Sequence, residues 1–250
     1  MTKRNDGATI PENWYLHLHE FLYTKGEQEA EQEAWLIREA LGLRPGHRVL
    51  DAPCAAGRMA VYLARAGIQV TGVDINLSFL RRARERLQKE NLPGSFCCTD
   101  IRRLGFRPAF DAAYNWWTSF GYFSDAGNLQ ALRSLAAAVR PGGRVLIEQP
   151  NRLLMRRLLV PVVSYGPWTL RNWWNASRQR IECIWTRTVE EREEAYPMSI
   201  RLYTLSQFRE LFRRAGLPLE AAYGDYEGRT YHATSPHLVV VGVKPATVSS

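Results

Sequence analysis

The sequence of 250 residues predicts a doubly wound α/β fold, and two observations predict it. Residues 47–53 form an apolar strand that ends in a loop of small residues, and a helical segment then leads to a second apolar strand at 69–75. The alternation of strands and helices continues as far as a strand at 144–149. This alternation is typical of a mostly parallel sheet whose crossovers are right-handed.

The helices are indicated by the spacing of apolar residues and by capping residues. Gly67 closes the helix over 57–66, as a C-terminal glycine commonly does. A cap at Asn76 or Ser78 begins the helix that follows the second strand. An earlier helix over 27–42 carries apolar residues at helical spacing, at Ala30, Ala34, Ile37 and Leu41.

The first loop and the end of the second strand predict a nucleoside-bearing cofactor. Asp74 ends that strand, where a carboxylate can accept both hydroxyls of a ribose. Pro53 and Ala55 stand where the dinucleotide motif G-x-G-x-x-G has glycines, so a backbone cradle for phosphates would be poor. The residues therefore favour a cofactor that has a ribose and no phosphate, such as S-adenosylmethionine.

The run VLDAPCAAGRMAVYLARAGIQVTGVDINLSFLRRARER resembles the first two motifs of class I S-adenosylmethionine-dependent methyltransferases. The family loop is D-x-G-x-G-x-G, from which this chain departs at Pro53 and Ala55. Further motifs follow in the family's order: Asp100 after the third strand, a fourth strand at 110–115, and a PGG turn at 141–143. The resemblance covers residues 45–150 closely and the rest of the chain weakly.

The resemblance implies a Rossmann-like sheet that ends in an antiparallel hairpin of strands 217–223 and 237–244. It divides the chain into an N-terminal cap or lid (1–44), a cofactor-binding domain (45–150 with 201–250) and an inserted substrate lid (151–200). In the family this insertion forms a lid or a small antiparallel sheet. Its residues 181–189 alternate as a strand does.

Cofactor contacts are implied residue by residue. Asp74 would hold the ribose and Asp51 the methionine moiety, while Asp100 would face the adenine amino group. The alternatives are a helix cap at Asp74, a cap of the turn at Asp100 and a turn residue at Asn115. All the positions assigned to the cofactor are Asp51, Ala52, Pro53, Ala55, Gly57, Asp74, Ile75, Asp100, Ile101 and Asn115.

Methyl transfer from a sulfonium asks little of side chains, because alignment and desolvation supply most of the acceleration. A base is needed only where the acceptor loses a proton. The candidate bases are His17, His19, Glu148 and His232. Aromatic candidates for enclosing an acceptor are Tyr15, Trp116, Trp168, Trp173, Tyr223 and Tyr231. The aromatic residues of the insertion could equally form a small core of their own.

The formal net charge of the chain, +8 at pH 7, has several interpretations. Residues 151–180 carry six arginines and no acid. They could form a solvated basic face, hold a nucleic acid by phosphate contacts and stacking, or bind an anionic small acceptor. The apolar stretch at 153–163 could instead touch a membrane surface.

Other features narrow the prediction. The four cysteines contain no C-x-x-C pair, so we expect neither a disulfide scaffold nor a metal site. No apolar run is long enough to span a membrane and residues 1–14 lack a signal-peptide core, so we expect a cytoplasmic protein. The oligomeric state is not indicated.

The sequence therefore predicts an S-adenosylmethionine-dependent methyltransferase that yields S-adenosylhomocysteine. Its acceptor would be a small molecule, anionic or aromatic, methylated at oxygen or nitrogen. The alternatives are an RNA or DNA methyltransferase that uses residues 151–180 to hold its polymer, and a cofactor-binding protein without catalysis.

Overall fold

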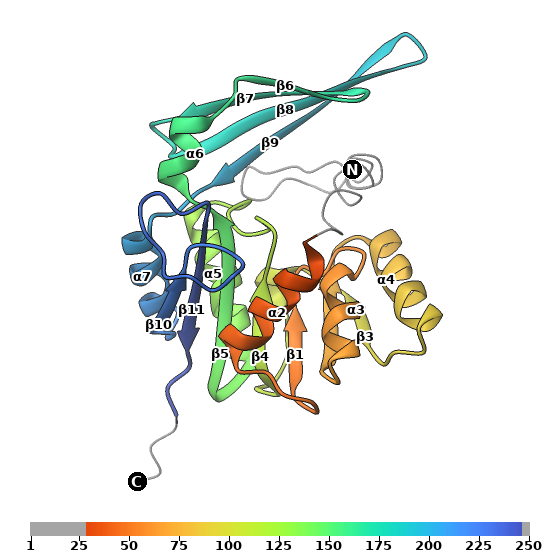
Figure 1. The fold of residues 1–250 in the computed structure, drawn as a ribbon, viewed down its shortest axis with the longest axis vertical. Helices are drawn as coiled ribbons and strands as arrows, with labels where there is room; N and C mark the ends of the chain where they lie inside the picture. Colours follow the sequence, from red (N-terminus) through yellow and green to blue (C-terminus); the bar gives the residue numbers. More distant parts are fainter. Residues whose placement is uncertain (1–28, 247–250) are drawn as a thin grey trace.

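The computed structural model describes residues 29–246, which form two β-sheets and the helices around the larger one (Figure 1). The larger sheet has seven strands in the order β10-β11-β5-β4-β1-β2-β3. Only β11 runs antiparallel to its neighbours, so the mostly parallel sheet with a terminal hairpin is confirmed. The strands are β1 (Arg48–Asp51), β2 (Gln69–Asp74), β3 (Ser95–Cys98), β4 (Phe110–Asn115), β5 (Val139–Pro150), β10 (Leu219–Tyr223) and β11 (His237–Val243).

The strand order places the carboxyl ends of the parallel strands at one edge. The chain moves outward from β1 through β2 to β3, and then returns to the other side of β1 with β4 and β5. The order therefore reverses between β1 and β4. In open α/β sheets, ligands bind at such a switch point, beyond the carboxyl ends of the strands.

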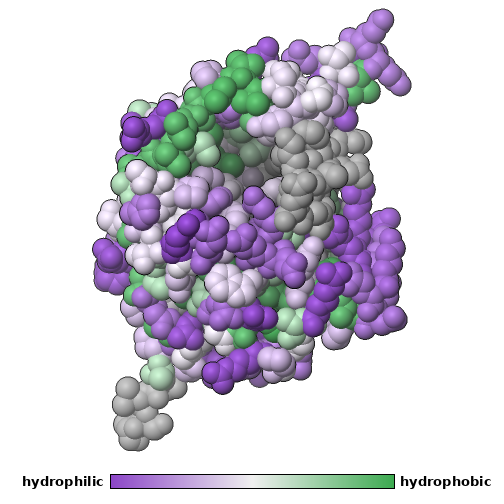
Figure 2. Space-filling view, in the orientation of Figure 1, coloured by the Kyte–Doolittle hydropathy of each residue, from purple (hydrophilic) through white to green (hydrophobic). Residues whose placement is uncertain are grey.

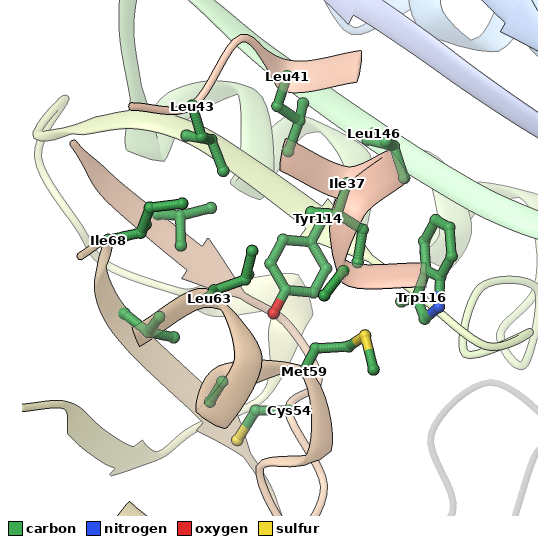
Figure 3. Packing of buried hydrophobic residues seen from close by; sticks show 14 of the residues in the cluster. Ile37, Leu41, Leu43, Cys54, Met59, Leu63, Ile68, Tyr114, Trp116 and Leu146 are labelled. Carbon is green, nitrogen blue, oxygen red and sulfur yellow. The ribbon is translucent and has the colours of Figure 1, made fainter. Parts of the chain in front are cut away.

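Helices cover both faces of this sheet, and successive strand residues point to opposite faces. Val49 packs in the cluster with α2, α3 and α4, whereas Leu50 packs in the cluster with α5 and α7. Figure 3 shows Tyr114 amid the first cluster, its hydroxyl directed toward the loop that carries Cys54. The helices are α2 (Ala30–Leu41), α3 (Arg58–Arg65), α4 (Leu77–Lys89), the 3-10 helix η1 (Ile101–Arg103), α5 (Asp125–Ala138), α6 (Arg152–Leu158) and α7 (Leu205–Arg214).

Two helices begin where they do because polar side chains cap their N-termini. The Asn76 side chain accepts the backbone N–H groups of Ser78 and Phe79, so Asn76 is the cap of α4 and Ser78 is not. Thr204 and Gln207 form a reciprocal capping box at the start of α7. Both caps satisfy backbone donors that the helix itself leaves unpaired.

The insertion forms a second, four-stranded antiparallel sheet, as the resemblance implies. Its strands, in spatial order, are β6 (Val162–Tyr165), β7 (Trp168–Asn175), β8 (Arg180–Val189) and β9 (Arg192–Arg201). It extends over the edge of the main sheet where β1 ends (Figure 1). Figure 2 shows the surface hollowed beneath it. Only β8 was predicted as a strand from its alternation.

Arg180 anchors the second sheet to the first. Its guanidinium donates hydrogen bonds to the backbone carbonyls of Gly121, Phe123 and Ser199 at 2.8 to 3.0 Å. Arg152 is likewise engaged, donating to the side-chain oxygens of two glutamines. Two of the six arginines at 151–180 are therefore structural, which reduces the basic surface that the sequence indicates. Within residues 29–246, no helix is long and apolar enough to cross a membrane.

Candidate functional site

The loop at 52–57 between β1 and α3 lies at the switch point and is fixed by its neighbours. Ala52 N–H donates to the carbonyl of Tyr114 on β4 at 3.0 Å. Gly57 caps α3 with a left-handed φ of 74°, and a Cβ at this position would lie 2.8 Å from the Cβ of Ala83. Glycine is therefore required both for its conformation and for the close approach of α4.

Asp74 is held by backbone donors and keeps part of its acceptor capacity. One carboxylate oxygen accepts the N–H of Ala55 at 3.1 Å, and the other accepts the N–H of Asn76 at 2.8 Å. A carboxylate has about four acceptor sites, so Asp74 keeps acceptor capacity for a ligand beside these backbone donors. Burial raises the pKa of Asp74 to about 6, against the opposing effect of these hydrogen bonds.

Asp51 ends β1 and lies in the same buried region. Burial raises the pKa of Asp51 to about 8, and nearby Asp74 adds to the rise, whereas the Tyr114 hydroxyl and Arg58 oppose it. Two buried carboxyl groups beside a loop of small residues form a site that a cationic ligand would stabilise, because it would favour their ionised forms.

The side-chain oxygen of Asn115, at the end of β4, is buried and has no hydrogen-bond partner within residues 29–246. The Asn115 amide nitrogen donates to the carbonyl of Ala52 at 2.8 Å, which directs the side chain toward the loop. Buried polar atoms are seldom left unpaired, so this oxygen fits a site whose polar ligand completes its hydrogen bonding.

The residues proposed to meet the adenine differ in exposure. The Asp100 carboxylate caps η1 by accepting the N–H of Arg102 at 2.8 Å and pairs with the same residue's guanidinium at 2.7 Å. The cap that we considered as an alternative is therefore present, and a role toward adenine remains a prediction. Ile101 is buried, whereas Ile75 is 59% exposed directly after Asp74 and offers the open apolar surface.

A second polar cluster lies where β5 meets β11. One oxygen of buried Glu148 is 2.9 Å from Nδ1 of His237, and the other accepts the N–H of Thr118 at 2.9 Å. The ring of Tyr226 stacks on that of His237, with centroids 4.2 Å apart. Tyr226 in turn packs against Trp116, the residue after β4. This cluster therefore borders the end of β4, next to the loop site.

The sequence analysis named Glu148 and missed His237. The topology contains a signal that identifies it: the last strand runs antiparallel to β5, so its first residue meets the end of β5. His232, which we named instead, is exposed, and its Nδ1 lies 2.9 Å from the hydroxyl oxygen of Thr234. Trp117 and Thr118 have φ of 56° and 58°, an uncommon conformation for such side chains that Glu148 helps to hold.

A third buried group, also missed, joins α2 to the site. The Glu33 carboxylate accepts hydrogen bonds from both terminal nitrogens of the Arg58 guanidinium, at 2.9 and 2.7 Å. It also accepts one from the indole N–H of Trp116. Arg58 also lies over the ring of Trp117, 5.1 Å from its centroid. Glu33 falls three residues after Ala30, on the apolar face of α2, and this spacing was the signal available in the sequence.

The remaining predicted acceptor residues occupy different surroundings. Trp168 is buried among Trp185 and Tyr196 in the core of the second sheet, so here the interpretation as a separate small core is the one observed. Trp173 is exposed. The hydroxyl of Tyr231 donates to Asn151 at 3.0 Å. Tyr223 is half-buried against the first cluster. Tyr15, His17 and His19 lie outside the described residues.

No group of three or more histidine, cysteine, aspartate or glutamate side chains within residues 29–246 is arranged to hold a metal ion. All four cysteines are free thiols. Cys54 faces Gly72, where an added Cβ would lie 2.7 Å from its sulfur, and burial raises the pKa of its thiol well above the usual value. Cys54 is therefore a packing residue of the loop.

Residues 49–143, which span this site from β1 to the PGG turn, match the family model described as a methyltransferase domain. The match spans fewer than half of the residues of the chain, and it supports the resemblance to class I S-adenosylmethionine-dependent methyltransferases. It is 37% identical over 126 residues to the malonyl-[acyl-carrier protein] O-methyltransferase of Pseudescherichia vulneris, a match that covers 49% of this chain and 47% of that protein. The chain thus spans about half the length of this curated relative.

Solved structures share the fold of this chain across most of its length. The CcbJ methyltransferase of Streptomyces caelestis superposes with a TM-score of 0.73 at 18% identity, covering 87% of this chain and 90% of that one. An amino pentose methyltransferase from Micromonospora echinaspora, solved with S-adenosylmethionine bound, gives a TM-score of 0.62 at 20% identity, with coverage of 91% and 97%.

Proposed function

We propose that this chain transfers a methyl group from S-adenosylmethionine to an oxygen or nitrogen atom of a small-molecule acceptor and leaves S-adenosylhomocysteine. The observation that carries the proposal is the group of buried acceptor atoms at the switch point. Asp51, Asp74 and Asn115 all lie there, and the described chain leaves acceptor capacity of Asp74 and Asn115 unused. The residues therefore fit the cofactor that the family uses.

The two ends of the loop would bind different parts of the cofactor. The acceptor capacity that Asp74 retains suits the vicinal hydroxyls of a ribose. Asp51 and the side-chain oxygen of Asn115 are acceptors for an ammonium group, and the small side chains at Ala52 and Ala55 leave room beside them. When bound, the cofactor supplies an electrophilic methyl group on a sulfonium.

The Glu148 cluster would accept the proton that the acceptor loses on methylation. With Glu148 ionised, Nδ1–H of His237 donates to it, and this fixes the tautomer in which Nε2 is the basic nitrogen. The His237 side chain keeps 28% of its surface exposed, whereas Glu148 keeps 1%. We therefore assign proton acceptance to His237 and the positioning of its ring to Glu148.

A small acceptor fits the site better than a polymer. The rings of Trp116 and Tyr226 pack against each other 5.4 Å apart beside the end of β4, and aromatic rings at this position suit an aromatic acceptor. The nucleic-acid alternative relied on the six arginines at 151–180, of which Arg152 and Arg180 are engaged within the protein. Binding of a polymer would also weaken steeply with salt, which distinguishes it from a small acceptor.

Calorimetric titration with S-adenosylhomocysteine, and with NAD as the control ligand, tests the cofactor assignment. We expect micromolar binding of the first and none of the second. Asp74→Ala should weaken S-adenosylhomocysteine binding by about a hundredfold, because it removes two hydrogen bonds to a charged acceptor. Glu220→Ala is the matched control, since it removes an exposed carboxylate paired with Arg144 on a distant strand. Equal affinities in the two variants would refute the ribose contact.

Binding without turnover would favour the non-catalytic alternative. The chain is incubated with S-adenosylmethionine and a panel of hydroxylated and amino-substituted aromatic and anionic compounds. Formation of S-adenosylhomocysteine that depends on one acceptor supports the proposed transfer. Tight cofactor binding with no product from any acceptor would support a protein that only binds the cofactor.

A further inference from the structure

The most apolar part of the described surface lies on the insertion, away from the site. Residues 29–246 have nine large apolar side chains that are strongly exposed, and five of them fall within 153–173, exposed by 43% to 65%. We call the segment 153–173 the α6–β6 face. Figure 2 shows an apolar band along α6 and β6. The five residues are Leu153, Leu158, Val160, Val162 and Trp173.

The α6–β6 face is ordered by its hydrogen bonds, although little of it is buried. None of the residues of α6 is buried. The segment that follows is tied to β7, because Asn172 donates from its backbone to the carbonyl of Pro161 at 2.8 Å and from its side chain to that of Val160 at 3.1 Å. Val162 pairs with Arg171 across β6 and β7, so these two side chains share one face of the sheet.

Basic side chains accompany the apolar ones. Arg157 and Arg171 are exposed, and neither makes an ion pair with any residue of the described chain. Arg156 is also exposed and lies over the ring of Trp174, 5.2 Å from its centroid. No acid occurs in residues 151–180. The exposed charges beside the apolar band are therefore basic, whereas Glu182, which lies opposite Trp173 on β8, is mostly buried and pairs with Arg178 at 3.7 Å.

The exposed acids of the second sheet are gathered at its other end. The hairpin that joins β8 to β9 carries Glu190, Glu191, Glu193 and Glu194, and it projects away from α6 (Figure 1). The sheet thus has one basic, apolar end and one acidic end. This separation would orient the sheet on a negatively charged apolar partner, with the acidic hairpin held away from it.

The charge pattern decides between possible occupants. Two copies meeting through the same face would bring their unpaired arginines together without acids to balance them. A nucleic acid would complement the arginines but would leave the exposed leucine and valine side chains without an apolar environment. A bilayer that contains anionic lipids provides phosphates for the arginines and acyl chains for the apolar residues.

We propose that the α6–β6 face binds the surface of a lipid bilayer that contains anionic lipids, with Leu158 and Val162 at the acyl boundary and Arg157 and Arg171 at the headgroups. The contact does not depend on methyl transfer. It would hold the hollow beneath the second sheet close to the membrane surface.

Co-sedimentation with vesicles tests this proposal on the full chain. One vesicle is phosphatidylcholine alone, and the other is phosphatidylcholine mixed with phosphatidylglycerol. We expect partition to the mixed vesicles only, reduced by added salt because the headgroup contacts are screened. Arg157→Glu/Arg171→Glu and Leu158→Asp/Val162→Asp should each reduce the partition coefficient by about tenfold or more, since each basic residue contributes about fivefold near an anionic surface.

The matched control is Val189→Asp/Arg192→Glu, which makes the same kinds of change on exposed residues at the acidic end of the same sheet. It should partition as the wild type does. Circular dichroism and gel filtration establish that all three variants fold. Failure of the wild type to sediment with mixed vesicles would overturn the proposal, as would equal partition of the three variants. So would a wild-type dimer that only the two α6–β6 variants dissociate, because the face would then bind a second copy.

Discussion

The two polar regions of the site hold their carboxyl groups in different ways. Asp74 is bound by backbone N–H groups from residues 2 and 19 positions away. Glu148 is bound by residues 30 and 89 positions away, one of which is a histidine side chain. The first arrangement is built by one strand, loop and helix unit. The second exists only when β5, β11 and the loop after β4 are assembled.

This difference indicates which region suits a ligand shared by related proteins and which suits a ligand that differs between them. A carboxylate held by local backbone donors persists wherever the strand and loop motif persists, and this suits a cofactor that every member of the family shares. A cluster assembled from distant side chains can change one residue at a time, and this suits an acceptor that differs between members. Such a division of roles is expected where function resides in sites carried by a common fold.

The largest effect that we expect is on turnover. It concerns the Glu148 cluster, which is the region assembled from residues far apart in the sequence. His237→Ala should lower kcat by about 10²- to 10⁴-fold with an acceptor whose proton must be removed, because a positioned base contributes that much. S-adenosylhomocysteine affinity should stay unchanged, since the proposed cofactor site is the other region. Added imidazole should restore part of the rate. A variant that retains its rate would show that the cluster only supports the loop at Thr118.

The buried pair of Arg58 and Glu33 tests how far the assembled region depends on distant partners. Arg58→Met should lower the free energy of unfolding by about 3–5 kcal/mol, because it leaves the Glu33 carboxylate buried without a cation. The double variant Glu33→Gln/Arg58→Met should recover much of that loss. The exposed pair of Arg213 and Glu210 is the control, and Arg213→Met should leave the free energy of unfolding nearly unchanged, because water screens the pair. Urea unfolding measures all three, and similar losses at both pairs would contradict this account.

The same contrast explains what the sequence could predict. The fold class, the loop at 52–57 and the place of Asp74 follow from local patterns: apolar strands, small residues and a carboxylate at a strand end. His237 could not be found in this way, because its partner is fixed by strand order rather than by spacing. Glu33 lies on the apolar face of α2. The sequence predicts that such a face packs in the core, and it does not indicate that one of its positions carries a buried ion pair. Arg152 and Arg180 were counted as surface charge because their partners lie far along the chain.

The pH dependence of stability separates the local carboxyl groups from the rest. Because the pKa of Asp51 is about 8 in the folded state, the folded chain keeps this proton up to about pH 8, whereas the unfolded chain loses it near the ordinary aspartate pKa of 3.8. This contribution to stability is therefore complete below pH 3.8 and is lost as the pH rises toward 8.

Between about pH 6.5 and about pH 7.5, Asp51 should lower the unfolding free energy by about 1.4 kcal/mol, since one proton is released per unfolding event. Asp74 contributes little in this window, because its pKa is about 6. Asp51→Asn should remove the slope, as chemical denaturation at the two pH values measures. A slope that persists in the variant would assign it to another group.

The smallest effect concerns the one local feature in which this loop departs from its family. Ala55 occupies a glycine position of the motif with a left-handed φ of 44°. That conformation costs a non-glycine residue roughly 1–2 kcal/mol, and glycine loses up to about 1 kcal/mol more backbone freedom on folding. Ala55→Gly should therefore stabilise the chain by about 0.5–1 kcal/mol. Ala56→Gly is the control, because Ala56 is buried and has no such φ, and it should destabilise. If both substitutions destabilise equally, the alanine at 55 is unstrained, and the loop's departure from glycine then has a cause other than backbone conformation.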